Sequence, residues 1–178
     1  NHTTMLDPIV MYGALRHRFV RAVSAHETFR ALGGLTGIFL SKLGVMPVDR
    51  SHGKTVMVPL IDLMVRGESL EMFPEAKIST SGKPLPYKLG AAVISNAAFD
   101  QLGGLEAVGI VPVYIDYHSR HEASALNFWK MGFHWRGGVT VTFCEPIWLA
   151  DLEDRDPSHV MELVRKSIEA CRCSKLPR

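Results

Sequence analysis

Apolar residues recur along this chain in two alternating patterns, one with the spacing of helices and one with that of strands. The helical spacing predicts helices over residues 8–16, 28–43, 55–66, 89–102 and from 157 onward. Short apolar or strictly alternating runs predict strands over residues 19–24, 45–48, 70–73, 109–117 and 139–143. Strands that alternate with helices predict an α/β domain with a mixed, largely parallel sheet flanked by helices.

Local signals refine this pattern at three places. Residues 75–86 are rich in Ser, Thr, Gly and Pro and predict a loop. Pro112 interrupts the strand predicted over residues 109–117, which favours an edge position or a strand end. Asp156 and Pro157 predict the N-cap and first position of the last helix. The apolar stripe expected on that helix consists of Val160, Leu163, Val164 and Ile168.

Composition bounds the class of protein. The 178 residues have a net charge of +2 and predict a single globular domain over residues 1–178. This charge gives no indication of nucleic-acid binding. Residues 1–60 carry seven Lys and Arg residues against three Asp and Glu residues. Such an excess favours an anionic substrate or an anionic membrane surface, and a simply solvated basic face explains it equally well.

Cysteine usage and the start of the chain bear on its surroundings. Three cysteines make no disulfide framework, and Cys171 and Cys173 have no matching Cys or His pair for zinc, so we expect reduced thiols in a cytosol-facing domain. No run reaches the roughly 18–20 apolar residues of a membrane span. The chain lacks an initiator Met and opens on a candidate active-site motif, so we expect an upstream segment, able to carry an anchor, to precede it.

The candidate motif places His2 five positions before Asp7. An imidazole is the natural general base at neutral pH, and a carboxylate on its other ring nitrogen fixes the tautomer and stabilises the imidazolium. These two residues therefore predict activation of a hydroxyl or a water. In the structural alternative, Asp7 caps a helix whose first residue is Pro8, and His2 is a loop residue.

Further blocks follow this motif in a fixed order. They are Gly44 to Arg50, Phe73-Pro74-Glu75-Ala76-Lys77, Val111-Pro112-Val113 and, at the end, residues 141–147. Their order and spacing resemble the glycerophospholipid acyltransferase family of the lysophosphatidic acid acyltransferase type. The resemblance covers residues 1 to about 150 and implies a glycerolphosphate acyltransferase-like fold.

Acyl transfer from a thioester to an alcohol needs a base, a stabiliser for the oxyanion and a clamp for the acceptor's phosphate. His2 would be the base and Asp7 its orienting partner. Arg50 can bind a phosphate through two hydrogen bonds, and Lys77 can bind it as a point charge. Backbone N–H groups around Ala76 are the expected oxyanion donors. No serine or cysteine nucleophile is needed, since the bound hydroxyl can attack directly.

The resemblance assigns roles to two further segments. It implies that Glu75 takes part in acceptor binding, whereas the structural alternative is a carboxylate that ties its loop to Arg50 or Lys77. We interpret residues 111–113 as architecture that shapes an acyl channel. The histidines elsewhere are weaker candidates; His118 and His121 with Glu122 could mimic a metal site, and we expect no metal there.

Three positions depart from the family pattern. Ala76 replaces a glycine, which is tolerable only if the backbone there keeps φ negative. Ile78 stands where many members carry an arginine that binds glycerol phosphate, and Lys77 is expected to compensate. Cys144 replaces a glycine far from the chemistry. These departures leave acyl transfer intact and put lysophosphatidic acid in doubt as the acceptor.

The resulting hypothesis is an O-acyltransferase that moves a fatty acyl group to the hydroxyl of a lysophospholipid-type acceptor. The acyl donor would be acyl-CoA or acyl-carrier protein, with no other cofactor. The domain would work on the cytoplasmic face of a membrane, peripheral or anchored through a preceding segment, and would bind no nucleic acid. The alternatives are the same chemistry on a glycolipid or aminolipid, and a non-catalytic lipid-binding domain.

Overall fold

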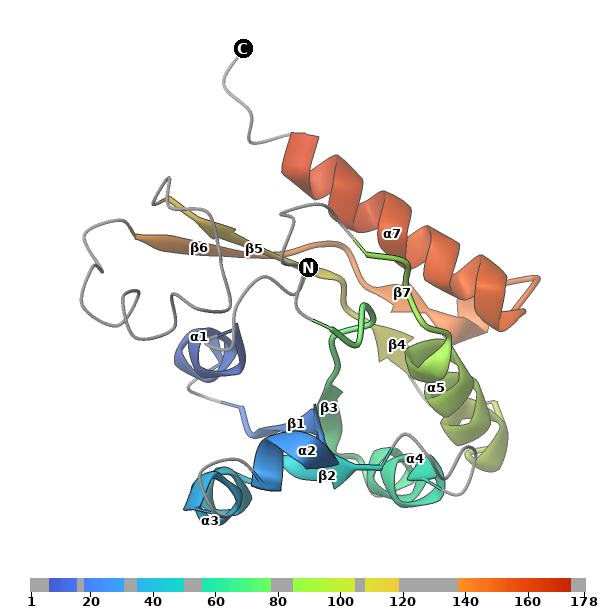
Figure 1. Cartoon of the computed structure of the whole chain (residues 1–178). Coiled ribbons are helices and arrows are strands. Elements are labelled where there is room, and N and C mark those ends of the chain that lie inside the picture. Colours follow the sequence, from blue (N-terminus) through green and yellow to red (C-terminus); the bar gives the residue numbers. More distant parts are fainter. Residues whose placement is uncertain are drawn as a thin grey trace.

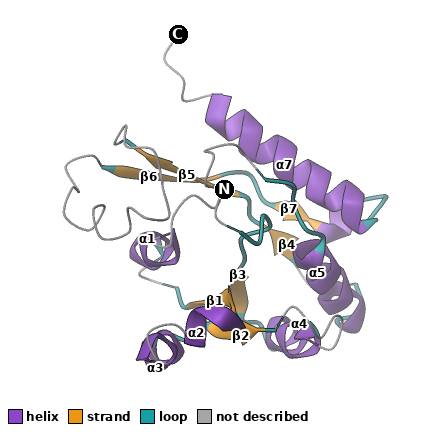
Figure 2. Cartoon of the chain, viewed as in Figure 1, coloured by secondary structure: helices purple, strands orange, loops and turns teal. Residues whose placement is uncertain are grey.

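The computed structural model describes residues 7–15, 18–30, 35–49, 56–77, 85–104, 108–118 and 138–173. In the described residues, helices and strands mostly alternate up to residue 101, a run of strands follows over residues 109–148, and a long helix comes last (Figures 1 and 2). A parallel sheet flanked by helices is present, as the apolar spacing predicts. None of the helices that the structure describes has the length and apolarity to cross a lipid bilayer.

The parallel sheet has three strands in the order β2-β1-β3. The strands are β1 (Val20–Ala25), β2 (Met46–Val48) and β3 (Ser69–Glu71). Val23 of β1 is in register with Met46 of β2, and Ala22 of β1 with Glu71 of β3. All three strands run in one direction, so the segments that follow them gather at one edge of the sheet.

Four helices flank this sheet: α1 (Asp7–Ala14), α2 (His26–Arg30), α3 (Leu35–Lys42) and α4 (Val58–Val65). The single helix expected over residues 28–43 is therefore two helices, α2 and α3. They pack closely because Gly37 has no side chain, and a Cβ there would lie 2.8 Å from the carbonyl oxygen of Phe29. This close packing explains a glycine inside a helix, where it otherwise lowers helix stability.

The remaining strands pair antiparallel: β4 (Gly109–Ile110) with β7 (Ile147–Trp148), and β5 (Val113–Tyr117) with β6 (Val139–Phe143). The strand expected over residues 109–117 is split between Ile110 and Val113. Pro112 lies in the break because it has no N–H to donate to a ladder, while its carbonyl still accepts a 2.9 Å bond from the N–H of Cys144. The placement of Pro112 at a strand end is thus confirmed. Figure 1 shows the β5–β6 hairpin and the parallel sheet on opposite sides of α1.

The main core lies where α5 (Gly90–Gln101) and α7 (Pro157–Cys173) pack together beside β4 and β7. A short 3₁₀ helix, η4 (Leu149–Asp151), closes it. The buried residues of this core are Ala92, Phe99, Val108, Leu149, Val160, Met161, Val164 and Ile168. The stripe expected on α7 is correct except that Met161, and not Leu163, is buried.

The start of α7 is capped as predicted. The Asp156 carboxylate accepts hydrogen bonds from the backbone N–H groups of Ser158 at 2.9 Å and His159 at 3.4 Å. On its solvent face, Arg165 binds both Glu162 and Glu169. The helix therefore has one apolar face on the core and one charged face in water.

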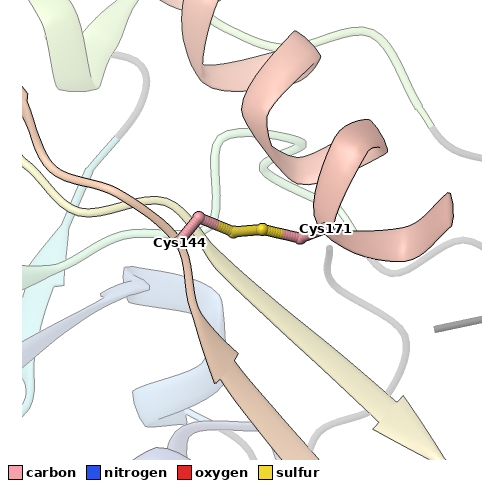
Figure 3. The surroundings of a disulfide bond; sticks show 2 residues. All are labelled: Cys144 and Cys171. Atoms are coloured by element: carbon pink, nitrogen blue, oxygen red, sulfur yellow. A yellow bond between two sulfur atoms is a disulfide. The ribbon is translucent and has the colours of Figure 1, made fainter. Parts of the chain in front are cut away.

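A disulfide joins Cys144, just after β6, to Cys171 near the end of α7 (Figure 3). The expectation of three reduced thiols is therefore wrong, and only Cys173 among the cysteines is free. The pairing was not visible in the sequence because 27 positions separate the two residues. The return of α7 across β5 brings them together.

Candidate active site

A cavity of about 700 Å³ opens at the carboxyl ends of the three parallel strands. It is lined by residues that end or follow β1, β2 and β3, together with residues of α4 and α5: Val23, Ser24, Ala25, Val48, Asp49, Met57, Leu60, Met72, Phe73, Pro74, Glu75, Ala76, Lys77, Gly90, Ala91 and Ile94 among them. Most of these side chains are apolar. We call this space the strand-end cavity; its position matches the sheet edge where parallel folds bind ligands.

The predicted loop after β3 forms one wall of the cavity. A tight turn begins at Phe73, whose carbonyl accepts a 3.0 Å hydrogen bond from the N–H of Ala76. Ala76 has a φ of 56°, so the condition of a negative φ is not met at this position. Its N–H is bound to Phe73, so this group is not an oxyanion donor in this structure. The alanine adopts a left-handed conformation that costs a residue with a Cβ about 1–2 kcal/mol.

Glu75 lies inside this turn and is only 4% exposed. Its negative charge and that of Glu169 add to burial in raising the pKa of Tyr87 to about 12, burial being the larger cause. Glu75 therefore faces the region between the cavity and the main core. A buried carboxylate at a cavity wall fits both interpretations of this residue, acceptor binding and loop anchoring.

Two lysines lie on the cavity wall, both with exposed side chains. Lys77 was predicted, and Lys88 was not. The backbone N–H of Lys88 donates a 2.7 Å bond to the carbonyl of Pro74, which fixes the segment of Lys88 beside the turn of Glu75. These two ammonium groups are the cations among the described residues that line the mostly apolar cavity.

Asp7, at the first position of α1, is completely buried. The hydroxyl of Tyr117, the last residue of β5, donates a hydrogen bond of 2.5 Å to Asp7 Oδ1. These residues meet because α1 packs against β6, the strand paired with β5. A carboxylate removed from water needs such a donor.

Glu71 is a second buried carboxyl, 8% exposed, on the last position of β3. Neither of its oxygens has a hydrogen-bond partner among the residues that the structure describes. Burial, and secondarily the charge of Asp7, raises the pKa of Glu71 to about 8. Glu71 therefore carries a proton at neutral pH, while Tyr117 supports the ionised form of Asp7.

Asp7, Glu71 and Tyr117, which we call the Asp7 cluster, are separate from the strand-end cavity. None of the three lines the cavity among the described residues. Strand β3 connects the two regions, because Glu71 belongs to the cluster and the residues that follow it, from Met72 to Lys77, line the cavity. His2, Arg50 and Ile78 lie outside the described residues, so the contact between His2 and Asp7 stays a prediction.

Sequence reasoning missed Glu71, Lys88 and Tyr117. The only signal for Glu71 was a carboxylate inside an apolar strand, directly before the Phe73-Pro74 block. Tyr117 offered no such signal, because 110 positions separate it from Asp7. The part of the chain that the structure covers holds no group of three or more His, Cys, Asp or Glu side chains able to bind a metal ion.

Comparison with known proteins bears on this site. A family model described as Acyltransferase matches residues 1–116. The fold is similar to that in the crystal structure of the 1-acyl-sn-glycerophosphate (LPA) acyltransferase PlsC from Thermotoga maritima, with a TM-score of 0.61 and 17% sequence identity. That match covers 96% of this chain and 63% of PlsC, so the chain spans less than two thirds of the length of PlsC.

A search of curated proteins gave no match. The family model nevertheless covers well over half of the chain, including the His2–Asp7 motif and the Phe73-Pro74 block. The family predicted from the sequence blocks is confirmed: the chain belongs to the acyltransferase family.

Proposed function

We propose that this chain is an O-acyltransferase that moves a fatty acyl group from a thioester donor to the hydroxyl of a lysophospholipid-type acceptor. The observation that carries this proposal is the buried carboxylate of Asp7, which lies five positions after His2 in a domain of the acyltransferase family. The hydroxyl of Tyr117 donates a hydrogen bond to this carboxylate. A fully buried carboxylate that follows an imidazole is suited to orient a general base.

In the proposed reaction, His2 removes the proton of the acceptor hydroxyl while its oxygen attacks the thioester carbonyl. The tetrahedral oxyanion then collapses, the carbon–sulfur bond breaks and the thiolate receives the proton from the His2 imidazolium. Asp7 stabilises the imidazolium between these steps. An ester and a free thiol result, and no covalent acyl-enzyme is formed.

The strand-end cavity suits the other parts of the substrates. Its apolar lining from β1, α4 and α5 favours a fatty acyl chain, whose burial contributes about 0.8 kcal/mol for each CH₂ group. Lys77 and Lys88 on its wall suit a phosphate of the acceptor or of the donor. Arg50, directly after the cavity residue Asp49, is proposed as a further phosphate ligand.

We also propose that the domain works at the cytoplasmic face of a membrane, where such acceptors reside. The Cys144–Cys171 disulfide makes this location testable. Glutathione and thioredoxin keep most cytosolic thiols reduced, so at a cytosolic site we expect the Cys144–Cys171 bond of the structure to be open in rapidly quenched cells, with both sulfurs alkylatable. Protection of two cysteines until reductant is added would instead place the domain in an oxidising compartment and contradict the proposed location.

The activity is tested by incubating the protein with labelled acyl-CoA or acyl-carrier protein and a panel of acceptors. We expect labelled ester with at least one lysophospholipid, and its loss in a folded His2→Ala variant. Label only on glycolipids or aminolipids would support the alternative acceptor class that Ile78 suggests. No transfer to any acceptor, together with lipid binding unaffected by His2→Ala, would favour a non-catalytic lipid-binding domain.

A further inference from the structure

The hydrogen bond between Tyr117 and Asp7 connects two parts of the fold that are distant in sequence. Asp7 begins α1, and Tyr117 ends β5. The 2.5 Å separation between the phenol oxygen and Asp7 Oδ1 is typical of a hydroxyl bound to an ionised carboxylate. With Oδ1 engaged by Tyr117, the hydrogen bond also fixes the rotation of the carboxylate.

The surroundings make this bond more than a surface contact. Alternation along β5 places Tyr117 on the same face as Ile115, which is 3% exposed, and opposite Val139 of the paired strand β6. The other polar residues of β5, Tyr114 and Asp116, point to the opposite face. From the β5–β6 hairpin, Tyr117 is therefore the polar side chain that reaches Asp7 in an apolar setting.

The second buried carboxyl, Glu71, approaches Asp7 from β3. Two carboxylates in a site closed to water resist being charged together, so one of them keeps its proton. Tyr117 donates to Asp7, and no described residue donates to Glu71. The hydrogen bond from this phenol therefore favours the ionised form of Asp7, while Glu71 is the carboxyl whose pKa is raised.

We propose that Tyr117 is a positioning residue for the catalytic base: it supports the ionised form of Asp7 and orients the carboxylate that the proposed function pairs with the imidazole of His2. This inference rests on the proposed function, since it assigns Tyr117 a role in that same chemistry. Tyr117 acts through Asp7 and does not line the strand-end cavity. It should therefore affect the chemical step and not substrate binding.

Other titratable groups near Glu71 come from α1 and the parallel sheet. Tyr12 of α1 lies close enough to Glu71 and Arg21 for their charges to affect its pKa, after the larger effect of burial. Its hydroxyl donates to the carbonyl of Leu43 at 2.9 Å, and Arg21 is paired with Glu68. Tyr12 and Arg21 therefore make these hydrogen bonds to Leu43 and Glu68.

The test compares Tyr117→Phe with Tyr114→Phe, a matched change on the opposite face of the same strand. Without the phenol proton, the His2–Asp7 pair binds a proton more tightly. We expect kcat to fall about tenfold with KM unchanged, and the acid limb of the kcat–pH profile to move up by about one pH unit. Tyr114→Phe should keep the wild-type profile. An unchanged limb in a folded Tyr117→Phe variant would overturn the inference.

Two controls keep this result interpretable. If Tyr117→Phe lowers the melting temperature too far for assay, 3-fluorotyrosine at position 117 retains the hydroxyl and makes it a stronger donor. The acid limb should then move to lower pH, and no movement would contradict a positioning role. Failure of the proposed function would look different, because the wild type would then transfer no acyl group or His2→Ala would stay active.

Discussion

The Asp7 cluster and the strand-end cavity meet at the end of β3, where Glu71 of the cluster is followed by cavity residues, yet their chemistry differs. The cluster holds two buried carboxyls and a phenol, with a charge kept from water. The cavity is open and mostly apolar, and its described lining includes two exposed lysines beside Asp49 and the buried Glu75. The difference indicates a division of labour, in which the cluster controls proton transfer and the cavity controls substrate binding.

The sharpest way to break this comparison is Asp7→Asn. The amide keeps the shape and can still accept the bond from Tyr117, but it cannot stabilise an imidazolium. We expect kcat to fall about a thousandfold with KM nearly unchanged, measured by steady-state acyl transfer. Asp62→Asn, an exposed site paired with Arg66, is the control. A rise in KM without loss of kcat would assign Asp7 to substrate binding instead of proton transfer.

Glu71→Gln tests whether burial in the cluster keeps the carboxyl of Glu71 protonated in the folded protein. The pKa of Glu71 is about 8 in the fold and 4.5 in the unfolded chain, so the folded protein holds an extra proton between these values. Its free energy of unfolding therefore falls by about 1.4 kcal/mol for each pH unit across that window. Glutamine removes this loss, so the stability advantage of the variant should grow by about 3 kcal/mol from pH 6 to pH 8.

Denaturant unfolding at several pH values measures this advantage, and above pH 8 it should level off. Glu145→Gln, at an exposed position, should show no such trend. An advantage for Glu71→Gln that does not vary with pH would mean that Glu71 is already ionised in the folded protein.

The cavity side of the comparison is tested by Lys77→Ala and Lys88→Ala. Each change removes a cation from the cavity wall, so we expect KM for a phosphate-bearing substrate to rise about tenfold, or ~1.4 kcal/mol, with kcat retained. Raising the salt concentration should reduce this difference. Lys166→Ala, on the exposed face of α7, is the matched control. A fall in kcat alone would erase the distinction between the two regions.

The smallest predicted effect concerns the backbone of the cavity turn. Ala76 has a positive φ, which glycine adopts without a steric cost. After the greater freedom of glycine in the unfolded chain is subtracted, Ala76→Gly should stabilise the fold by about 0.5–1 kcal/mol. Ala97→Gly within α5 should do the opposite. Destabilisation by Ala76→Gly in thermal unfolding would contradict the strained turn.

The sequence predicts most elements of the fold because their signals are local. The alternation of residues 139–143 and the Asp156 cap each depend on neighbours in the chain, and both appear as expected. The split of the strand at Pro112 depends on a partner strand, and the disulfide of Cys144 depends on the return of α7. Such features need tertiary contacts that periodicity does not encode.

The same limit applies to the site. Asp7, Glu75 and Lys77 were recognised because they sit in motifs of fixed spacing. Tyr117 and Lys88 were missed because their roles come from packing: α1 meets the end of β5, and the segment of Lys88 is bound to Pro74. The positive φ of Ala76 was not visible in the sequence for a related reason, since the turn that binds its N–H to Phe73 sets its conformation.

The central claim is that the ring of His2 and the carboxylate of Asp7 are hydrogen-bonded, and proton NMR of the imidazole N–H tests it most directly. We predict a strongly downfield ring N–H signal in the wild type, which His2→Ala abolishes and Asp7→Asn shifts upfield by weakening the acceptor. A His2 ring signal that is the same with and without the Asp7 carboxylate would contradict the account.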